Sequence, residues 1–144
     1  MKQKAIAIAA VSMIVAFLFL PVWLKAPNVF LYSVNAGEVS AIRVRDGNNG
    51  EVFEITDKES IRYIVESIQG QTFKKDGVSL GYAGTWFHFS FCNESGEVIS
   101  QFYINSADTV RKDPFFYKTQ AGALQNVTDY LEQIEGEIKT GTVE

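Results

Sequence analysis

The chain has 144 residues, with 17 acidic and 13 basic side chains and a single cysteine. This length holds one independent hydrophobic core but not comfortably two, and one cysteine excludes an internal disulfide. The acidic balance does not favour nucleic acid as a partner, because the phosphate backbone demands basic surfaces.

The first 24 residues differ from the rest of the chain. After Lys2 and Lys4, residues 5–24 (AIAIAAVSMIVAFLFLPVWL) carry no charge. At about 1.5 Å per residue, a helix of this length reaches roughly 30 Å, the thickness of a bilayer's hydrocarbon core. The positive-inside rule then predicts a single-pass protein of the cell membrane, with its C-terminal domain outside.

Residues 1–24 are either a retained signal anchor or a cleaved signal peptide. A signal peptide needs small residues at a cleavage site close behind its apolar region, whereas this run ends in Trp23 and Leu24. A better pattern ends at Ala36, about a dozen residues farther on. We therefore expect a retained anchor, with a secreted protein cleaved after Ala36 as the alternative.

Residues 25–36 are expected to be a linker or a first strand, and residues 37–144 an extracytoplasmic domain. Residues 1–37 hold three positive charges and no acid, so the remainder has 10 basic and 17 acidic side chains and a net charge of −7. An acidic domain outside the membrane agrees with the predicted orientation.

Two periodicities alternate along this domain. Apolar residues at every second position predict strands, and apolar residues three or four positions apart predict helices. For the first helix, Thr56 and Glu59 fit a capping box, and Gly70 is placed to end it. Residues 71–84 are expected to be a short segment followed by a glycine-containing loop. Strands are expected at 39–46, 51–55, 85–92, 97–105, 108–113 and 115–119, and helices at 56–70 and 123–139.

This order of elements predicts an α+β domain, in which an antiparallel sheet has two helices packed on one face. Phe87, Phe89 and Phe91 share one face of their strand, and Phe102 and Ile104 alternate in the same way on the next. We expect these five side chains to form a core beneath the helices rather than an aromatic ligand pocket.

The opposite face of the same strands would carry Trp86, His88, Ile99 and Tyr103. This surface is richer in aromatic and apolar groups than a solvated face needs, and exposed apolar patches often mark binding sites. It is therefore the candidate partner surface. The alternative is that another part of the chain covers it.

His88 and Cys92 are the only histidine and the only cysteine. Four residues along a strand separate them by roughly 13 Å, whereas a thiol needs its base at about 3 Å. Zinc sites need three or four protein ligands. The sequence therefore predicts no catalytic residue, no metal site and no cofactor, and Cys92 is interpreted as a small apolar strand residue.

Three segments carry a resemblance: ITDKESIRYIVESI (55–68), TFKKDGVSLGY (72–82) and NSADTVRKDPFFY (105–117). In them the chain resembles a family of small, uncharacterised exported or membrane-anchored domains of Gram-positive bacteria. The likeness covers Val39 to Ile134, and its motifs are structural. It implies a location outside the membrane and an α+β domain, and it assigns no functional residue.

The favoured hypothesis is a non-catalytic, membrane-tethered extracytoplasmic domain that binds a protein or an envelope component. One alternative is an exported small hydrolase, which requires the loops at residues 77–84 and 108–113 to converge on a cleft near His88. The other alternative is a secreted inhibitor or immunity-type protein, released by cleavage after Ala36.

Overall fold

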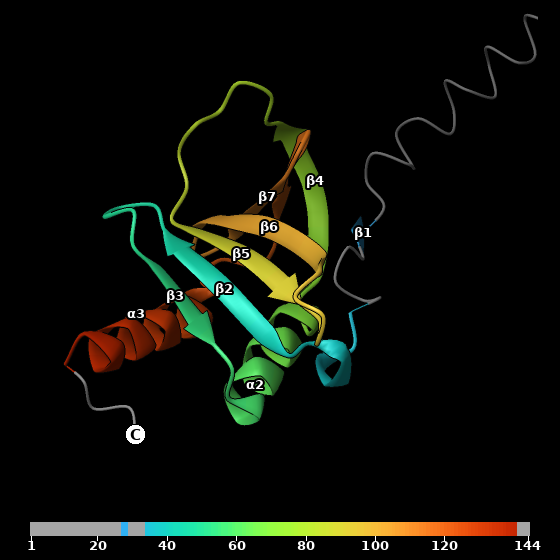
Figure 1. Ribbon diagram of the computed structural model, residues 1–144. Coiled ribbons are helices and arrows are strands. Elements are labelled where there is room, and N and C mark those ends of the chain that lie inside the picture. The colour runs from blue at the N-terminus through green and yellow to red at the C-terminus, as the bar shows by residue number, and fades with distance from the viewer. Residues whose placement is uncertain (1–26, 29–33, 141–144) are drawn as a thin grey trace, which may run out of the picture.

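The computed structural model describes residues 27–28 and 34–140 of the chain (Figure 1). The predicted anchor at residues 1–24 lies outside the described residues. Within the described ranges, neither helix is long and apolar enough to cross a membrane.

The described residues form one antiparallel sheet and two α-helices, so the domain belongs to the α+β class. The strands lie in the order β1-β4-β8-β7-β6-β5-β2-β3. In chain order the elements are β1 (Pro27–Asn28), the 3₁₀ helix η1 (Ala36–Glu38), β2 (Ala41–Asp46), β3 (Val52–Ile55), α2 (Lys58–Gln69), β4 (Phe73–Val78), β5 (Phe87–Cys92), β6 (Val98–Ser106), β7 (Thr109–Lys112), β8 (Phe115–Lys118) and α3 (Gln125–Thr140).

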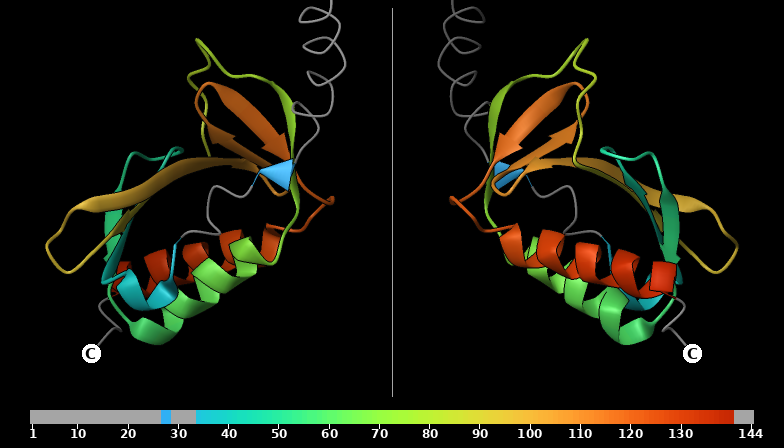
Figure 2. Two further views of the ribbon diagram at one scale, coloured as in Figure 1. Left: turned by 90° about the vertical axis from the view of Figure 1, so that its right-hand side faces the viewer. Right: turned by 90° about the vertical axis from the view of Figure 1, so that its left-hand side faces the viewer.

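Both helices lie beneath the same face of the sheet, which we call the inner face (Figure 2). The five predicted core side chains are at most 1% exposed, so this prediction is confirmed. The ring of Phe102 lies 5.2 Å from that of Phe89 and 5.6 Å from that of Phe91. Helix α2 contributes Ile61, Ile64, Val65 and Ile68 to this core, and α3 contributes Val127 and Leu131.

The predicted capping box of α2 is wrong by one residue. The helix begins at Lys58, so Asp57 and not Thr56 is its N-cap. The Asp57 carboxylate accepts a 2.8 Å hydrogen bond from the backbone N–H of Ser60, which would otherwise lack a partner in the first helical turn.

Strand β4 was not predicted, because its sequence does not alternate. Only Phe73 is buried in it, and the register against β8 shifts between Lys75 and Gly77. β4 is nevertheless an integral strand, paired with β8 on one side and with β1 on the other. The pairing comes from tertiary contacts and not from a local pattern.

The folded unit includes residues that precede position 37. In β1, Pro27 lies opposite Lys74 and Asn28 opposite Phe73. Val34 is 5% exposed and belongs to the hydrophobic core. Cleavage after Ala36 would therefore remove both a strand pairing and a core side chain.

Candidate functional site

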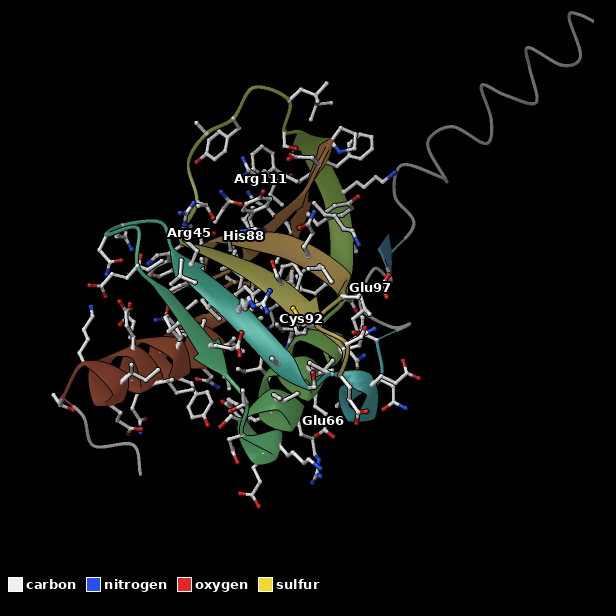
Figure 3. The ribbon with its side chains drawn as sticks, in the orientation of Figure 1. Arg45, Glu66, His88, Cys92, Glu97 and Arg111 are labelled. Carbon is white, nitrogen blue, oxygen red and sulfur yellow. The ribbon has the colours of Figure 1, made fainter. Side chains whose placement is uncertain are left out.

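A row of side chains crosses the sheet on its outer face, the face opposite the helices. Direct cross-strand pairing sets it: Arg45 on β2 lies opposite His88 on β5, His88 opposite Tyr103 on β6, Tyr103 opposite Arg111 on β7, and Arg111 opposite Phe116 on β8. Side chains that face each other in this way are neighbours on one face. Figure 3 labels Arg45, His88 and Arg111 of this row. We call these five residues the cross-strand row.

The middle of the row is a stack of three planar groups. The rings of His88 and Tyr103 lie 4.3 Å apart and nearly parallel, at 16°. On the other side of this pair, the guanidinium carbon of Arg111 lies 4.1 Å from the centre of the Tyr103 ring. Tyr103 therefore contacts an imidazole on one strand and a cation on the next, and the cation–π contact holds Arg111 in place.

The loop between β4 and β5 covers the Arg111 end of the row. The Tyr82 carbonyl accepts a hydrogen bond from Nη1 of Arg111, and the Tyr82 ring meets the Phe116 ring edge-on at 5.1 Å. Arg111 is left only 6% exposed. At the other end of the row Arg45 is exposed, so the row opens to solvent on the β2 side.

Positive charge dominates the surroundings of His88. Burial, followed by the nearby guanidinium groups of Arg45 and Arg111, holds the pKa of His88 below its ordinary value. The imidazole is therefore uncharged at neutral pH. Arg45 has no ion-pair partner within the described residues, whereas its strand neighbour Arg43 pairs with Glu54 at 2.8 Å.

Two nitrogen atoms of the row are buried without a hydrogen-bond partner among the described residues: Nε2 of His88 and Nε of Arg111. The closest acid to the latter is Asp113, whose Oδ1 lies 3.7 Å from Nε, beyond hydrogen-bond range. Buried polar groups are almost always hydrogen-bonded, and those that are not call for an explanation. Here they share one row with an unneutralised cation.

The four residues of the predicted partner surface do not lie together. His88 and Tyr103 stack in the middle of the row. Trp86 precedes β5, packs against the hydrophobic core and stacks on Phe87 at 6.1 Å. Ile99 lies four residues before Tyr103, at a register shift in which Val98 and Ser100 pair with consecutive residues of β5.

Cys92 lies at the end of β5 remote from the row's centre (Figure 3). It is buried, it pairs with Ala41 on β2, and its Sγ lies 3.8 Å from the Ser90 carbonyl. Among the described residues, no three of the histidine, cysteine, aspartate and glutamate side chains are grouped so that they could hold a metal ion.

Sequence reasoning did not include Arg45, Arg111 or Tyr82 in the candidate partner surface. The signal for the two arginines was present, because Val44 and Val110 face inward and alternation turns their neighbours outward. What the alternation could not supply was the pairing that brings β2, β5, β6 and β7 into one register. Tyr82 lies in a loop, for which no periodicity exists.

Comparisons with family models, with curated proteins and with solved structures found no match for the chain. A role for the cross-strand row therefore rests on the chemistry of its own residues.

Proposed function

We propose that the protein is a membrane-tethered extracytoplasmic domain that binds a protein or envelope component without catalysing a reaction. The cross-strand row is the proposed binding surface, and an anionic group of the partner is the proposed ligand. The observation that carries this proposal is the uncharged His88 between two guanidinium groups, one of which has no counter-ion in the described chain.

An anion fits the row because it would neutralise what the domain leaves uncompensated. Arginine forms bidentate, charge-assisted hydrogen bonds with carboxylates and phosphates, which are stronger than neutral ones. Arg45 has its guanidinium free for such a contact at the open end of the row. A bound anion would also favour the protonated imidazole of His88, which would add a further positive charge.

The membrane tether is supported by the apolar run at residues 5–24 and by the places of residues 27–28 and 34–36 in the fold. The next site with a good cleavage pattern ends at Ala36, yet Val34 packs in the core and β1 pairs with β4. A cut there would damage the fold. This favours retention of the anchor over release of a secreted inhibitor.

The test uses the one histidine as a reporter. In the full chain in lipid nanodiscs, a label at Nε2 of the imidazole gives one signal, because the chain has one histidine. We expect this signal to shift on titration with poly(glycerol phosphate) or with an acidic peptide, but not with a neutral glycan. Arg45→Ala should weaken the binding at least about tenfold, equivalent to about 1.4 kcal/mol.

Arg62→Ala is the matched control, because Arg62 is exposed on α2 beneath the opposite face of the sheet. It should bind like the unmodified chain. A His88 signal that ignores every anionic ligand, or an Arg45→Ala variant with unchanged affinity, would contradict the proposal.

One observation favours the exported hydrolase as a second candidate. The β4–β5 loop and the β7–β8 turn do meet beside the row, where the Ser79 hydroxyl donates a 2.6 Å hydrogen bond to Asp113. A hydrolase built there would use His88 as its base, and its activity on ester or phosphodiester substrates would disappear in His88→Gln. Binding without turnover in the unmodified chain is the outcome that our proposal expects.

A further inference from the structure

Exposed apolar side chains gather at one place on the domain, the segment from Val78 to Tyr82, which we call the β4–β5 tip. Val78 is 64% exposed, Leu80 74% and Tyr82 50%. These are three of the eight large hydrophobic side chains that are exposed in the described chain, and Leu80 is the most exposed of all. Removing such side chains from water is favourable, so a concentration of them indicates a binding surface.

The β4–β5 tip is held in shape by hydrogen bonds. The Ser79 N–H donates to the Pro114 carbonyl at 2.9 Å, and the Tyr82 N–H donates to the Ser79 carbonyl at 3.0 Å. The Tyr82 ring lies against Gly84, where an added Cβ would come within 2.8 Å of the Tyr82 hydroxyl. The tip thus presents Leu80 outward from a fixed backbone while Ser79 is buried.

The pairing of β1 with β4 fixes the direction of β1 relative to the tip. The two strands are antiparallel, with Pro27 opposite Lys74 and Asn28 opposite Phe73. Because β4 runs on from Lys74 to Val78, the direction from Asn28 to Pro27 points toward the end of β4 at which the tip lies. Figure 1 shows β1 beside β4 and the loop beyond the far end of β4.

Short lengths of chain separate β1 from the apolar run, and Lys74 from the tip. Leu24 is three residues before Pro27, and so lies at most about 11 Å from it. Val78 lies four residues beyond Lys74, about 13 Å along the strand in the same general direction. A bilayer spanned by residues 5–24 would therefore have its surface close to the β4–β5 tip.

We infer that the β4–β5 tip docks on the lipid surface, with Leu80 and Val78 at the acyl boundary and Tyr82 among the headgroups. This inference rests on the proposed function, because it takes residues 5–24 as a membrane anchor. Tyrosine is enriched at the interface of bilayers, and aliphatic side chains bind the boundary in proportion to their buried area. The second contact fixes the orientation of the domain, and it sets the Arg111 end of the cross-strand row beside the membrane.

The test reads the depth of single labels in the full chain, reconstituted in vesicles of phosphatidylcholine and phosphatidylglycerol. Leu80→Cys carries an environment-sensitive fluorophore, with Cys92→Ala as the background. Val98→Cys is the matched control, since Val98 is 45% exposed and lies opposite Cys92, at the end of β5 remote from the loop. We expect blue-shifted emission at position 80, and quenching by a lipid-borne quencher at least twofold stronger than at position 98.

A second variant separates docking from mere proximity. With the fluorophore at Val78→Cys, the further change Leu80→Asp should abolish the quenching, while flotation of the vesicles shows that the chain remains membrane-bound. Equal, weak quenching at positions 78, 80 and 98 in a chain that still floats would overturn the docking of the tip alone. Loss of the chain from the vesicles would overturn both this inference and the proposed tether.

Discussion

The two faces of strands β5 and β6 are built from alternating residues of the same segments, yet they differ in burial and in charge. The inner face carries Phe87, Phe89, Phe91 and Phe102, all at most 1% exposed and in one hydrophobic core with side chains of both helices. The outer face carries His88 and Tyr103, stacked on each other and flanked by arginines. One face buries apolar area and the other holds positive charge.

The difference concerns how completely each face is satisfied. The inner core gains stability from burial and needs no partner beyond the chain itself. On the outer face, His88 and Arg111 each keep a buried nitrogen without a hydrogen bond in the described chain. Where buried polar groups lack hydrogen bonds and no gain in stability compensates for this, a functional role is expected. The comparison therefore assigns stability to the inner face and supports the proposed binding role of the outer one.

The largest effect that we predict is for Phe89→Ala. Phe89 is fully buried between two other phenylalanine rings, so its truncation removes apolar contacts and leaves a cavity. We expect a loss of about 3–5 kcal/mol in the free energy of unfolding. Guanidinium denaturation of the full chain in detergent micelles, followed by circular dichroism, measures it.

Tyr103→Phe, a change on the outer face of the same pair of strands, is the control for this loss of stability. It keeps the ring on which His88 and Arg111 rest, so we expect a change of less than about 0.5 kcal/mol. Similar losses for Phe89→Ala and Tyr103→Phe would show that the two faces do not divide their roles in this way.

A buried polar group on the helix side of the sheet extends the comparison, because its hydrogen-bond partners come from the domain itself. Glu135 on α3 accepts hydrogen bonds from Asn49 at 2.9 Å and from Lys139 at 2.8 Å, and Lys139 also pairs with Glu51 at 2.6 Å. This network attaches α3 to the β2–β3 turn. We expect Glu135→Ala to lower the free energy of unfolding by about 1–3 kcal/mol, since it leaves the Asn49 amide without its acceptor.

The pH dependence of this contribution follows from the pKa of Glu135. The hydrogen bond from Lys139 holds that pKa below the ordinary carboxyl value. The contribution is therefore present above the unfolded pKa of about 4.3 and disappears as the pH falls through the folded value. Glu132→Ala, at an exposed position of the same helix, should have little effect at any of these pH values. A loss from Glu135→Ala that is equally large well below pH 4 would contradict the role of its charge.

The sequence predicted the inner face well and the outer one incompletely, for a physical reason. Alternation with period two determines which side chains share a face, and it located Phe87 and Tyr103 correctly on opposite faces. It placed Trp86 on the outer face, whereas this residue lies before β5 begins and packs against the hydrophobic core. The contacts that complete the row come from Arg45, Arg111 and Tyr82, which depend on strand order and on a loop. Neither strand order nor loop position is encoded in a local period.

The smallest predicted effect is the contribution of His88 to the pH dependence of folding stability. Because burial and the two arginines lower its pKa in the folded domain, the unfolded chain binds more protons below the unfolded pKa of about 6.5. Stability should be level above that pH and decline as the pH falls from about 6.5 towards the folded pKa. Denaturation midpoints at pH 7.5 and 5.5 measure this slope, which His88→Gln should remove. Equal slopes in both chains would contradict it.

Adding an anionic ligand provides the sharpest version of this measurement. If poly(glycerol phosphate) binds beside Arg45, its negative charge raises the pKa of His88 in the complex. The folded complex then binds the proton more readily than the free domain does, so the decline on acidification should shrink or reverse. Because His88→Gln cannot bind this proton, its midpoints should keep one pH dependence with and without the polymer. Only an anion bound at the outer face itself accounts for a change confined to the chain that retains His88.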